Sequence, residues 1–106
     1  MTEAAPLTPG QYVELNMPDN RYIGCGTRRL LILDEDGAYV NLFYPPQTAR
    51  VKMLRHDYDL SLMARVLNHD PKALAKRIKA NVSDRTRWGL DTGGRWTKEA
   101  LALLEK

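Results

Sequence analysis

Residues 30–44, LLILDEDGAYVNLFY, decide the fold of this chain. Two apolar runs, 30–33 and 39–44, flank the turn sequence DEDG at 34–37. A glycine in such a turn can take the positive φ that a short hairpin connection demands. The stretch therefore predicts a β-hairpin whose turn has three to four residues and includes Gly37.

Upstream of this hairpin, short apolar runs recur with the period of two that is typical of strands. Residues 12–15 alternate, MPDN at 17–20 breaks the pattern, and residues 21–25 resume it. Before them, residues 1–9 contain two prolines and no periodicity, which predicts a flexible leader. We therefore expect ordered structure to begin near Gln11.

Downstream of the hairpin, Pro45-Pro46 ends the strand because neither residue donates a backbone hydrogen bond. Residues 48–54 then form a one-sided strand, with Arg50 and Lys52 on the face opposite its apolar side chains. Five short antiparallel strands are too few for two packed layers. They predict a strongly bent five-stranded sheet or an SH3-like half-open barrel.

The apolar period becomes helical after Tyr58. Residues 60–68 are apolar over more than half of the helix circumference, and Asp59 is placed to cap them. After a break at 68–69, Asp70 followed by a proline predicts a second helix. One side of that helix has an apolar stripe formed by Leu74, Ala75, Ile78 and Val82. A second stripe, about 110° round the helix axis, is formed by Lys72, Lys76 and Lys79.

The C-terminal third combines arginine, tryptophan and glycine. RTRW at 85–88 and RW at 95–96 bracket a segment with three glycines, which predicts a short two-stranded hairpin. Thr97 can then cap a last helix over residues 98–105. The chain is thus expected to be α+β, with a leader (1–9), a small β-sheet subdomain (10–57) and a basic helical subdomain packed on the sheet (58–106).

Positive charge is concentrated in the second half of the chain. The net charge is +3 over 106 residues, yet residues 72–98 contain eight Lys/Arg against two Asp/Glu. Such a concentration favours polyanionic partners, nucleic acid first and anionic lipid second. A solvated basic surface with counterions is the alternative interpretation.

The order helix, tight turn, cationic helix and arginine-bearing hairpin is that of a winged helix-turn-helix, with residues 71–82 as the recognition helix. Leu74 suits the core of that motif, whereas Arg77 stands where the next core hydrophobe is expected and Ile78 follows one place late. The pattern predicts a regulatory nucleic-acid-binding protein, for DNA before RNA. Its phosphate contacts would come from Lys72, Lys76, Lys79, Arg85, Arg87 and Arg95.

A protein-interaction module, adaptor or inhibitor, is the alternative function. Small barrels present aromatic surfaces or a free sheet edge to partners. The neutral sheet half is also a candidate surface for the pairing of two copies of the chain. The aromatic residues that would carry this function are Tyr22, Tyr39, Phe43 and Tyr44.

The two tryptophans have two interpretations. Trp88 and Trp96 lie symmetrically in RWG and GRW, so they are expected to pair across the predicted hairpin and fix it to the core. The alternative is a stacking platform for unpaired bases, which requires exposed rings. Their exposure distinguishes the two.

Catalytic interpretations are weaker. Cys25, the single cysteine, is expected to be a small inert hydrophobe, and it can form no internal disulfide. The pairs His56-Asp57 and His69-Asp70 fall at element boundaries, where capping and turn roles explain them. We therefore expect no enzyme, no metal site and no cofactor.

With no signal segment and no apolar run near the ~20 residues of a membrane span, a cytoplasmic protein is expected.

Overall fold

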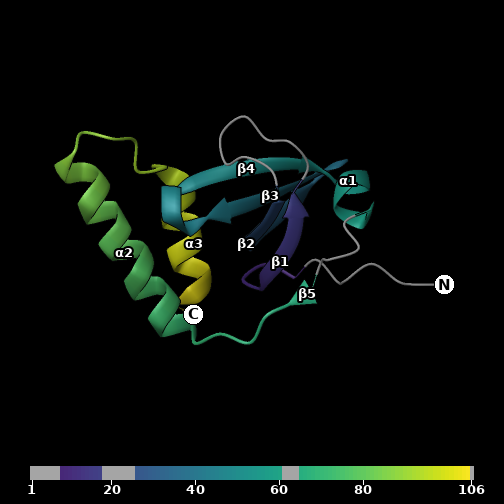
Figure 1. The fold of residues 1–106 in the computed structure, drawn as a ribbon, viewed down its shortest axis with the longest axis horizontal. Helices are drawn as coiled ribbons and strands as arrows, with labels where there is room; N and C mark the ends of the chain where they lie inside the picture. Colours follow the sequence, from purple (N-terminus) through teal and green to yellow (C-terminus); the bar gives the residue numbers. More distant parts are fainter. Residues whose placement is uncertain (1–7, 18–25, 61–64, 106) are drawn as a thin grey trace.

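The computed structural model describes residues 8–17, 26–60 and 65–105. It shows an α+β chain in which the sheet comes first and the two longer helices last (Figure 1). No helix within these ranges has the length and apolar character of a membrane span. The strands are β1 (Tyr12–Met17), β2 (Gly26–Asp36), β3 (Tyr39–Tyr44), β4 (Ala49–Leu54) and β5 (Arg65–Val66). The helical elements are the 3₁₀ turn η1 (Pro45–Gln47), α1 (Arg55–Leu60), α2 (Pro71–Arg87) and α3 (Arg95–Leu104).

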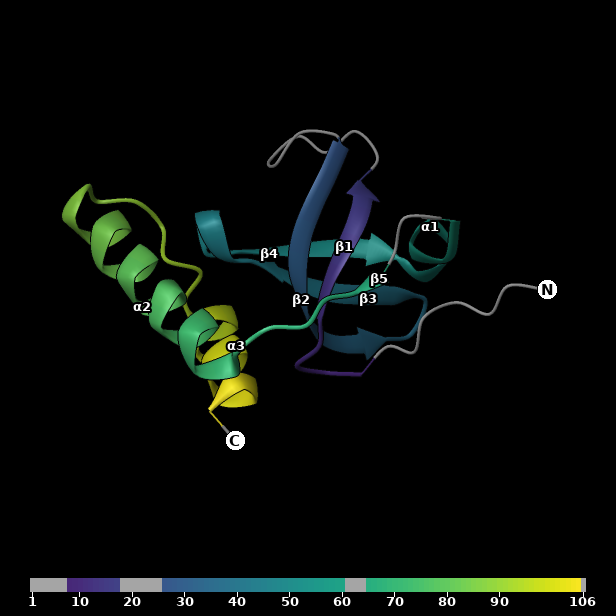
Figure 2. The same cartoon turned by 60° about the horizontal axis from the view of Figure 1, so that its bottom comes forward.

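The sheet is antiparallel and open. β1 to β4 form a meander, and β5 pairs with β1, which gives the order β4-β3-β2-β1-β5. Figure 2 shows β1 and β2 crossing β3 and β4 steeply, so the sheet is strongly bent, as the sequence predicts. A closed barrel is not formed by the described strands, because β4 and the short β5 remain its two edges. The strand expected at 21–25 lies outside the described residues.

The hairpin predicted within residues 30–44 is confirmed as β2 and β3. Asp36 pairs with Tyr39, so Gly37 and Ala38 alone form the turn, and Gly37 has a φ of 61°. This turn is tighter than the expected three to four residues. A register shift between Ile32 and Asp34 adds a bulge to β2, which increases the local bend.

Both faces of the sheet are buried. Leu30 and Ile32 of β2 point into a first core, whereas Leu31 and Leu33 point into a second core on the opposite face. The first core lies within the bent sheet and is completed by Tyr58 of α1. The second core lies under the two long helices and consists of Leu31, Leu33, Phe43, Leu74, Ala75, Ile78, Ala100 and Leu104.

Of the helix expected at 60–68, residues 61–64 lie outside the described residues, and residues 65–68 are not helical. α1 covers residues 55–60, and Asp59, expected as a cap, lies inside it. Residues 65–66 form β5 instead, in register with Val13 and Glu14 of β1, and the Leu67 N–H donates to the Tyr12 carbonyl at 2.8 Å. The exposed edge of β1 supplies backbone partners that override the helical period. A strand therefore precedes α2, and the expected helix-turn-helix is not formed.

The start of α2 agrees with the sequence, but its end does not. An Asp70 carboxylate oxygen accepts from the Lys72 N–H at 3.0 Å and caps the helix, as predicted. The helix then continues to Arg87. The positive charges of Arg85 and Arg87 in its last turn are favourable there, because that end of the helix dipole is negative. The hairpin expected at 85–96 is consequently absent: an irregular loop links α2 to α3.

This loop passes very close to the corner between η1 and β4. Gly93 has a φ of +77°, and a Cβ at this position would overlap the Thr48 carbonyl oxygen and approach the Thr97 hydroxyl to 2.7 Å. Only glycine fits both the backbone conformation and the space. The contact between Gly93 and Thr48 therefore fixes how α3 begins relative to the sheet.

Replacing Gly93 by alanine is expected to destabilise the fold much more than the same change at Gly89. Gly89 also has a positive φ, +70°, but no atom lies within 4 Å of its added Cβ. Gly89→Ala therefore carries only the left-handed strain, about 1–2 kcal/mol, whereas Gly93→Ala adds a backbone collision. Thermal unfolding followed by circular dichroism measures both. Equal losses would contradict the packing of the loop on Thr48.

Candidate functional site

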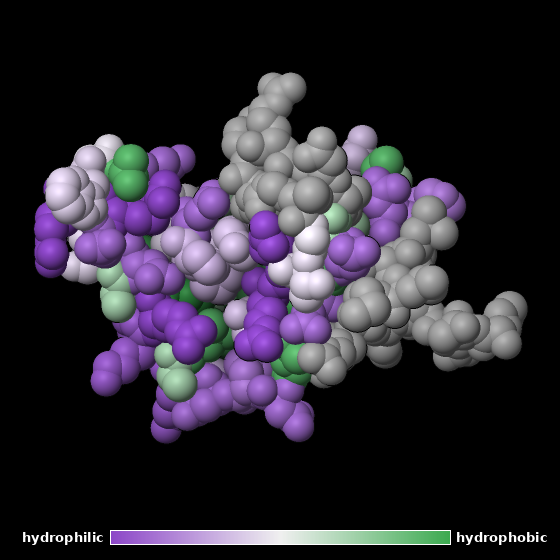
Figure 3. Space-filling model, viewed as in Figure 1, coloured by the Kyte–Doolittle hydropathy of each residue, from purple (hydrophilic) through white to green (hydrophobic). Residues whose placement is uncertain are grey.

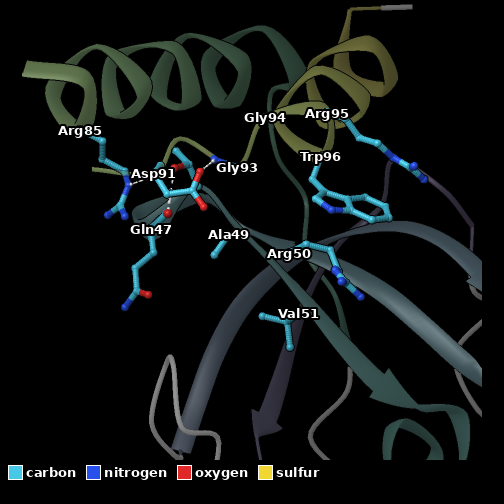
Figure 4. Close-up of a pocket in the computed structure, with 11 residues that line it drawn as sticks. Gln47, Ala49, Arg50, Val51, Arg85, Asp91, Gly93, Gly94, Arg95 and Trp96 are labelled. Carbon is cyan, nitrogen blue, oxygen red and sulfur yellow. Dashed lines mark hydrogen bonds between the residues drawn. The ribbon is translucent and has the colours of Figure 1, made fainter. Parts of the chain in front are cut away.

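A hollow of about 680 Å³ lies where α2, α3 and the start of β4 meet. Its walls come from η1 and β4, the last turn of α2, and the loop and first turn of α3 (Figure 4). We call it the arginine pocket, because Arg50, Arg85 and Arg95 line it. Figure 4 shows Arg85 at one side of the pocket and Arg50, Arg95 and Trp96 at the other. The fold thus brings cations from three separate segments to one hollow.

Trp96 positions two of these cations. The guanidinium carbons of Arg50 and Arg95 lie 4.8 Å and 4.5 Å from its ring centroid. The Trp96 ring is half-buried against the second core, which holds it in place. Cation–π contacts of this kind contribute about 0.5–2 kcal/mol, depending on desolvation. Arg95 also lies 3.5 Å from a Glu99 carboxylate oxygen, in an exposed pair of low energetic value.

Arg85 connects the pocket to the turn that follows α2. Its Nε donates to the Asp91 carbonyl at 2.6 Å, and its own carbonyl accepts from the Leu90 N–H at 2.9 Å. An Asp91 carboxylate oxygen in turn accepts from the Gly93 N–H at 3.0 Å. The Asp91 carboxylate in the pocket thus holds the loop through its bond with Gly93. Arg85 lines the hollow, and its Nε is fixed by the bond to the Asp91 carbonyl.

The start of α3 adds positive potential to the same place. Its N-cap is Gly94, which provides no side-chain hydrogen bond to the first N–H groups, and its first turn contains no acidic residue. Arg95 and Lys98 occupy that first turn instead. Cations at the positive end of a helix dipole are unfavourable, by about 0.3–1 kcal/mol each. An anion beside Arg95 in the pocket would relieve part of this repulsion.

The six cations predicted from sequence do not form one surface. Arg85 and Arg95 line the arginine pocket, while Lys79 forms an ion pair with Glu105 at 2.5 Å. At 100° per residue, Lys76 lies about 180° round α2 from Arg85. The exposed positions Lys72, Lys76 and Arg87 therefore lie away from the pocket. Figure 3 shows hydrophilic side chains gathered over the α2 side of the molecule.

Arg50 is the residue of the arginine pocket that reasoning from sequence missed. The alternation in β4 correctly places Arg50 and Lys52 on the face opposite Val51, and both are exposed. Nothing in that alternation shows that the start of α3 lies beside Arg50 and not beside Lys52. Only the packing of the helices on the sheet provides this information.

A second group of arginines borders a hollow of about 480 Å³ between the sheet and α2. Arg28, Arg29 and Arg77 line it together with Tyr12 and Tyr44. A buried Glu14 carboxylate accepts from the Arg29 Nε at 3.2 Å, so part of this positive charge is compensated. Each of the two hollows therefore combines three arginines with one acidic residue, Glu14 here and Asp91 in the arginine pocket.

The expected pairing of the two tryptophans is wrong. Trp88 follows the last turn of α2 and is 72% exposed, whereas Trp96 lies in the first turn of α3 and is half-buried. The two residues belong to different helix ends because no hairpin joins them. Only Trp88 has the exposure that the stacking interpretation requires.

The aromatic residues of the alternative function are dispersed. Phe43 is fully buried in the second core, so a partner cannot contact its ring. Tyr44 is half-buried, and Tyr39 is 40% exposed with the Lys52 ammonium 4.4 Å from its ring centroid. Tyr22 lies outside the described residues, as does Cys25.

The histidines occupy separate places. His56 is exposed in α1, and the His69 ring makes an edge contact with Tyr12 at 5.6 Å between centroids. Within residues 8–17, 26–60 and 65–105, no group of three or more His, Cys, Asp and Glu is arranged to hold a metal ion.

Comparison with protein-family models, curated proteins and solved structures finds no match for this chain.

Tyr12 is expected to make stability depend on alkaline pH. Burial raises the pKa of Tyr12 above its ordinary value of 10.0, and the nearby charges of Arg77 and Arg29 offset part of that rise. The folded state therefore holds the proton more tightly, so this stabilisation is complete below pH 10 and lost as the pH rises further. Urea unfolding should show a shallower alkaline decline in Tyr12→Phe than in the wild type. Identical declines would contradict the burial of the hydroxyl.

Proposed function

We propose that this chain binds nucleic acid, DNA before RNA, and that the arginine pocket receives phosphate groups of the strand. The observation that carries the proposal is the meeting of Arg50, Arg85 and Arg95 around one hollow. Guanidinium groups bind phosphate oxygens through paired hydrogen bonds, and this electrostatic term supplies most non-specific affinity for nucleic acid.

The start of α3 supports the same ligand. A helix start with no side-chain cap and no acidic residue in its first turn is favourable for an anion, and Arg95 and Lys98 are unfavourable for the helix unless an anion is bound. A sequence that places cations where they destabilise a helix gains from their use in binding. The exposed lysines of α2 add to the positive field that draws a polyanion to the molecule.

The sheet is proposed to be a half-open SH3-like barrel. Its order, β4-β3-β2-β1-β5, returns the last strand beside the first, and its strong bend encloses the first core. Such small bent sheets serve as scaffolds on which loops and added helices carry the binding residues. In this chain the added helices α2 and α3 complete the arginine pocket.

Arg50→Gln is expected to weaken binding, and Lys52→Gln is its matched control. Both cations are exposed on the same face of β4 and both stack on an aromatic ring, but only Arg50 lines the pocket. Fluorescence anisotropy with labelled single-stranded DNA, duplex DNA and RNA over a range of salt concentrations measures the affinity. The slope of log K against log salt should fall by about 0.7–0.9 in Arg50→Gln, because one phosphate contact is lost.

Two results would contradict the proposed function. One is the absence of binding to any of the three nucleic acids at low salt. The other is an equal loss of affinity in Arg50→Gln and Lys52→Gln, which would mean that net charge alone matters. Thermal unfolding of both variants checks that a weaker affinity does not come from a less stable fold.

One observation favours a protein-interaction function as the second candidate. Tyr39 and Leu54 are direct partners in the β3–β4 register and are 40% and 42% exposed at the open edge of the sheet. Open edges and exposed aromatic rings are used to bind other chains, including a second copy. Sedimentation equilibrium would show a dimer that persists at high salt and dissociates in Tyr39→Ala. A monomer under all conditions would remove this candidate for self-association.

A further inference from the structure

Trp88 is exposed to a degree that packing does not explain. Its exposed fraction, 72%, exceeds those of Leu90, Leu54 and Tyr39, the other large exposed hydrophobics of the described chain. Tryptophan usually buries most of its surface, and its ring is a large flat contact area with few rotatable bonds. A protruding tryptophan is therefore a candidate binding residue.

The backbone that carries Trp88 is firmly held. The Trp88 N–H donates to the Arg85 carbonyl at 3.1 Å, and the Gly89 N–H donates to the Thr86 carbonyl at 3.1 Å. The side chain of Arg85 closes the same turn by its bond to the Asp91 carbonyl. The ring therefore projects from a fixed point at the end of α2, so little backbone entropy is lost when a ligand covers it.

Trp88 also stands close in sequence to a residue of the arginine pocket, although it does not itself line the pocket. Arg85, which does line it, lies three positions earlier, so helical geometry separates the two side chains by about 60° round the axis of α2. Arg87 lies beside Trp88 and is exposed. A strand whose phosphate contacts Arg85 would bring the adjoining nucleotide to the Trp88 ring.

We propose that Trp88 stacks on an unpaired base, so that the ligand of this chain is single-stranded nucleic acid. This inference rests on the proposed function, because the arginine pocket holds the phosphates next to that base. In a duplex each base is covered by its neighbours, so the ring would find a free base face only in a single strand. Stacking on aromatic rings is tolerant of sequence, so we expect little base preference.

The test compares Trp88→Ala and Trp88→Phe with Leu90→Ala, an apolar residue of the same turn that is 51% exposed. The probes are labelled oligodeoxythymidine, a DNA hairpin duplex and phosphatidylserine vesicles. Trp88→Ala should bind oligodeoxythymidine roughly tenfold to a hundredfold more weakly, with duplex affinity unchanged. Trp88→Phe should retain part of the affinity, and Leu90→Ala all of it.

Tryptophan fluorescence provides a second readout. Oligodeoxythymidine should quench part of the wild-type emission, because the base lies on the Trp88 ring, and this quenching should be lost in Trp88→Phe. Trp96 remains in both proteins and lines the arginine pocket, so the emission change that persists in Trp88→Phe reports on Trp96. Persistence of the full quenching in Trp88→Phe would overturn the inference.

The remaining outcomes separate this inference from the proposed function. Equal weakening of single-strand and duplex binding in Trp88→Ala would overturn the stacking role. An unchanged affinity in Trp88→Ala together with weaker binding in Arg50→Gln would overturn it and leave the proposed function intact. Vesicle binding that depends on Trp88, without quenching by oligodeoxythymidine, would assign the ring to a lipid surface and overturn it as well. No binding to either DNA probe or to RNA would refute both proposals.

Discussion

Burial of β2 from both sides is the constraint on which the rest of the structure depends. Leu30 and Ile32 need an apolar cover on one face, and Leu31 and Leu33 need one on the other. The sheet bends over the first pair together with Tyr58 of α1, while α2 and α3 cover the second pair. The hydrophobic effect thus requires the C-terminal helices to pack on the sheet, and their packing creates the arginine pocket at its margin.

The pocket combines stabilising and destabilising contacts. Gly93 lies directly against Thr48, and Arg85 ties the loop to α2, so the walls are closely fixed. Arg95 and Lys98, by contrast, place positive charge at the positive end of the α3 dipole. This conflict supports the proposal that the pocket receives an anion, since a bound phosphate would convert repulsion into attraction.

Elements set by local chemistry could be predicted, and those set by distant partners could not. The hairpin around Gly37, the Asp70 cap and the apolar stripe of α2 follow from turn, capping and periodicity rules, and the structure contains all three. Residues 65–66 belong to a segment, 60–68, whose apolar residues recur with a helical period, yet pairing with β1 makes them a strand. Arg85 and Trp88 fit a hairpin pattern, yet the preceding helix continues through Arg85 because its carbonyl groups find partners in the turn.

By itself, the sequence determined the α+β class, the bent antiparallel meander and the excess of positive charge between residues 72 and 98, because composition and short-range periodicity encode these properties. Tertiary structure alone decided which cations meet. It selected Arg50, which is distant in sequence, and brought it to the same hollow as Arg85 and Arg95. The reason is that charge convergence depends on where the helices pack against the sheet, and that position is set by shape complementarity between buried side chains far apart along the chain.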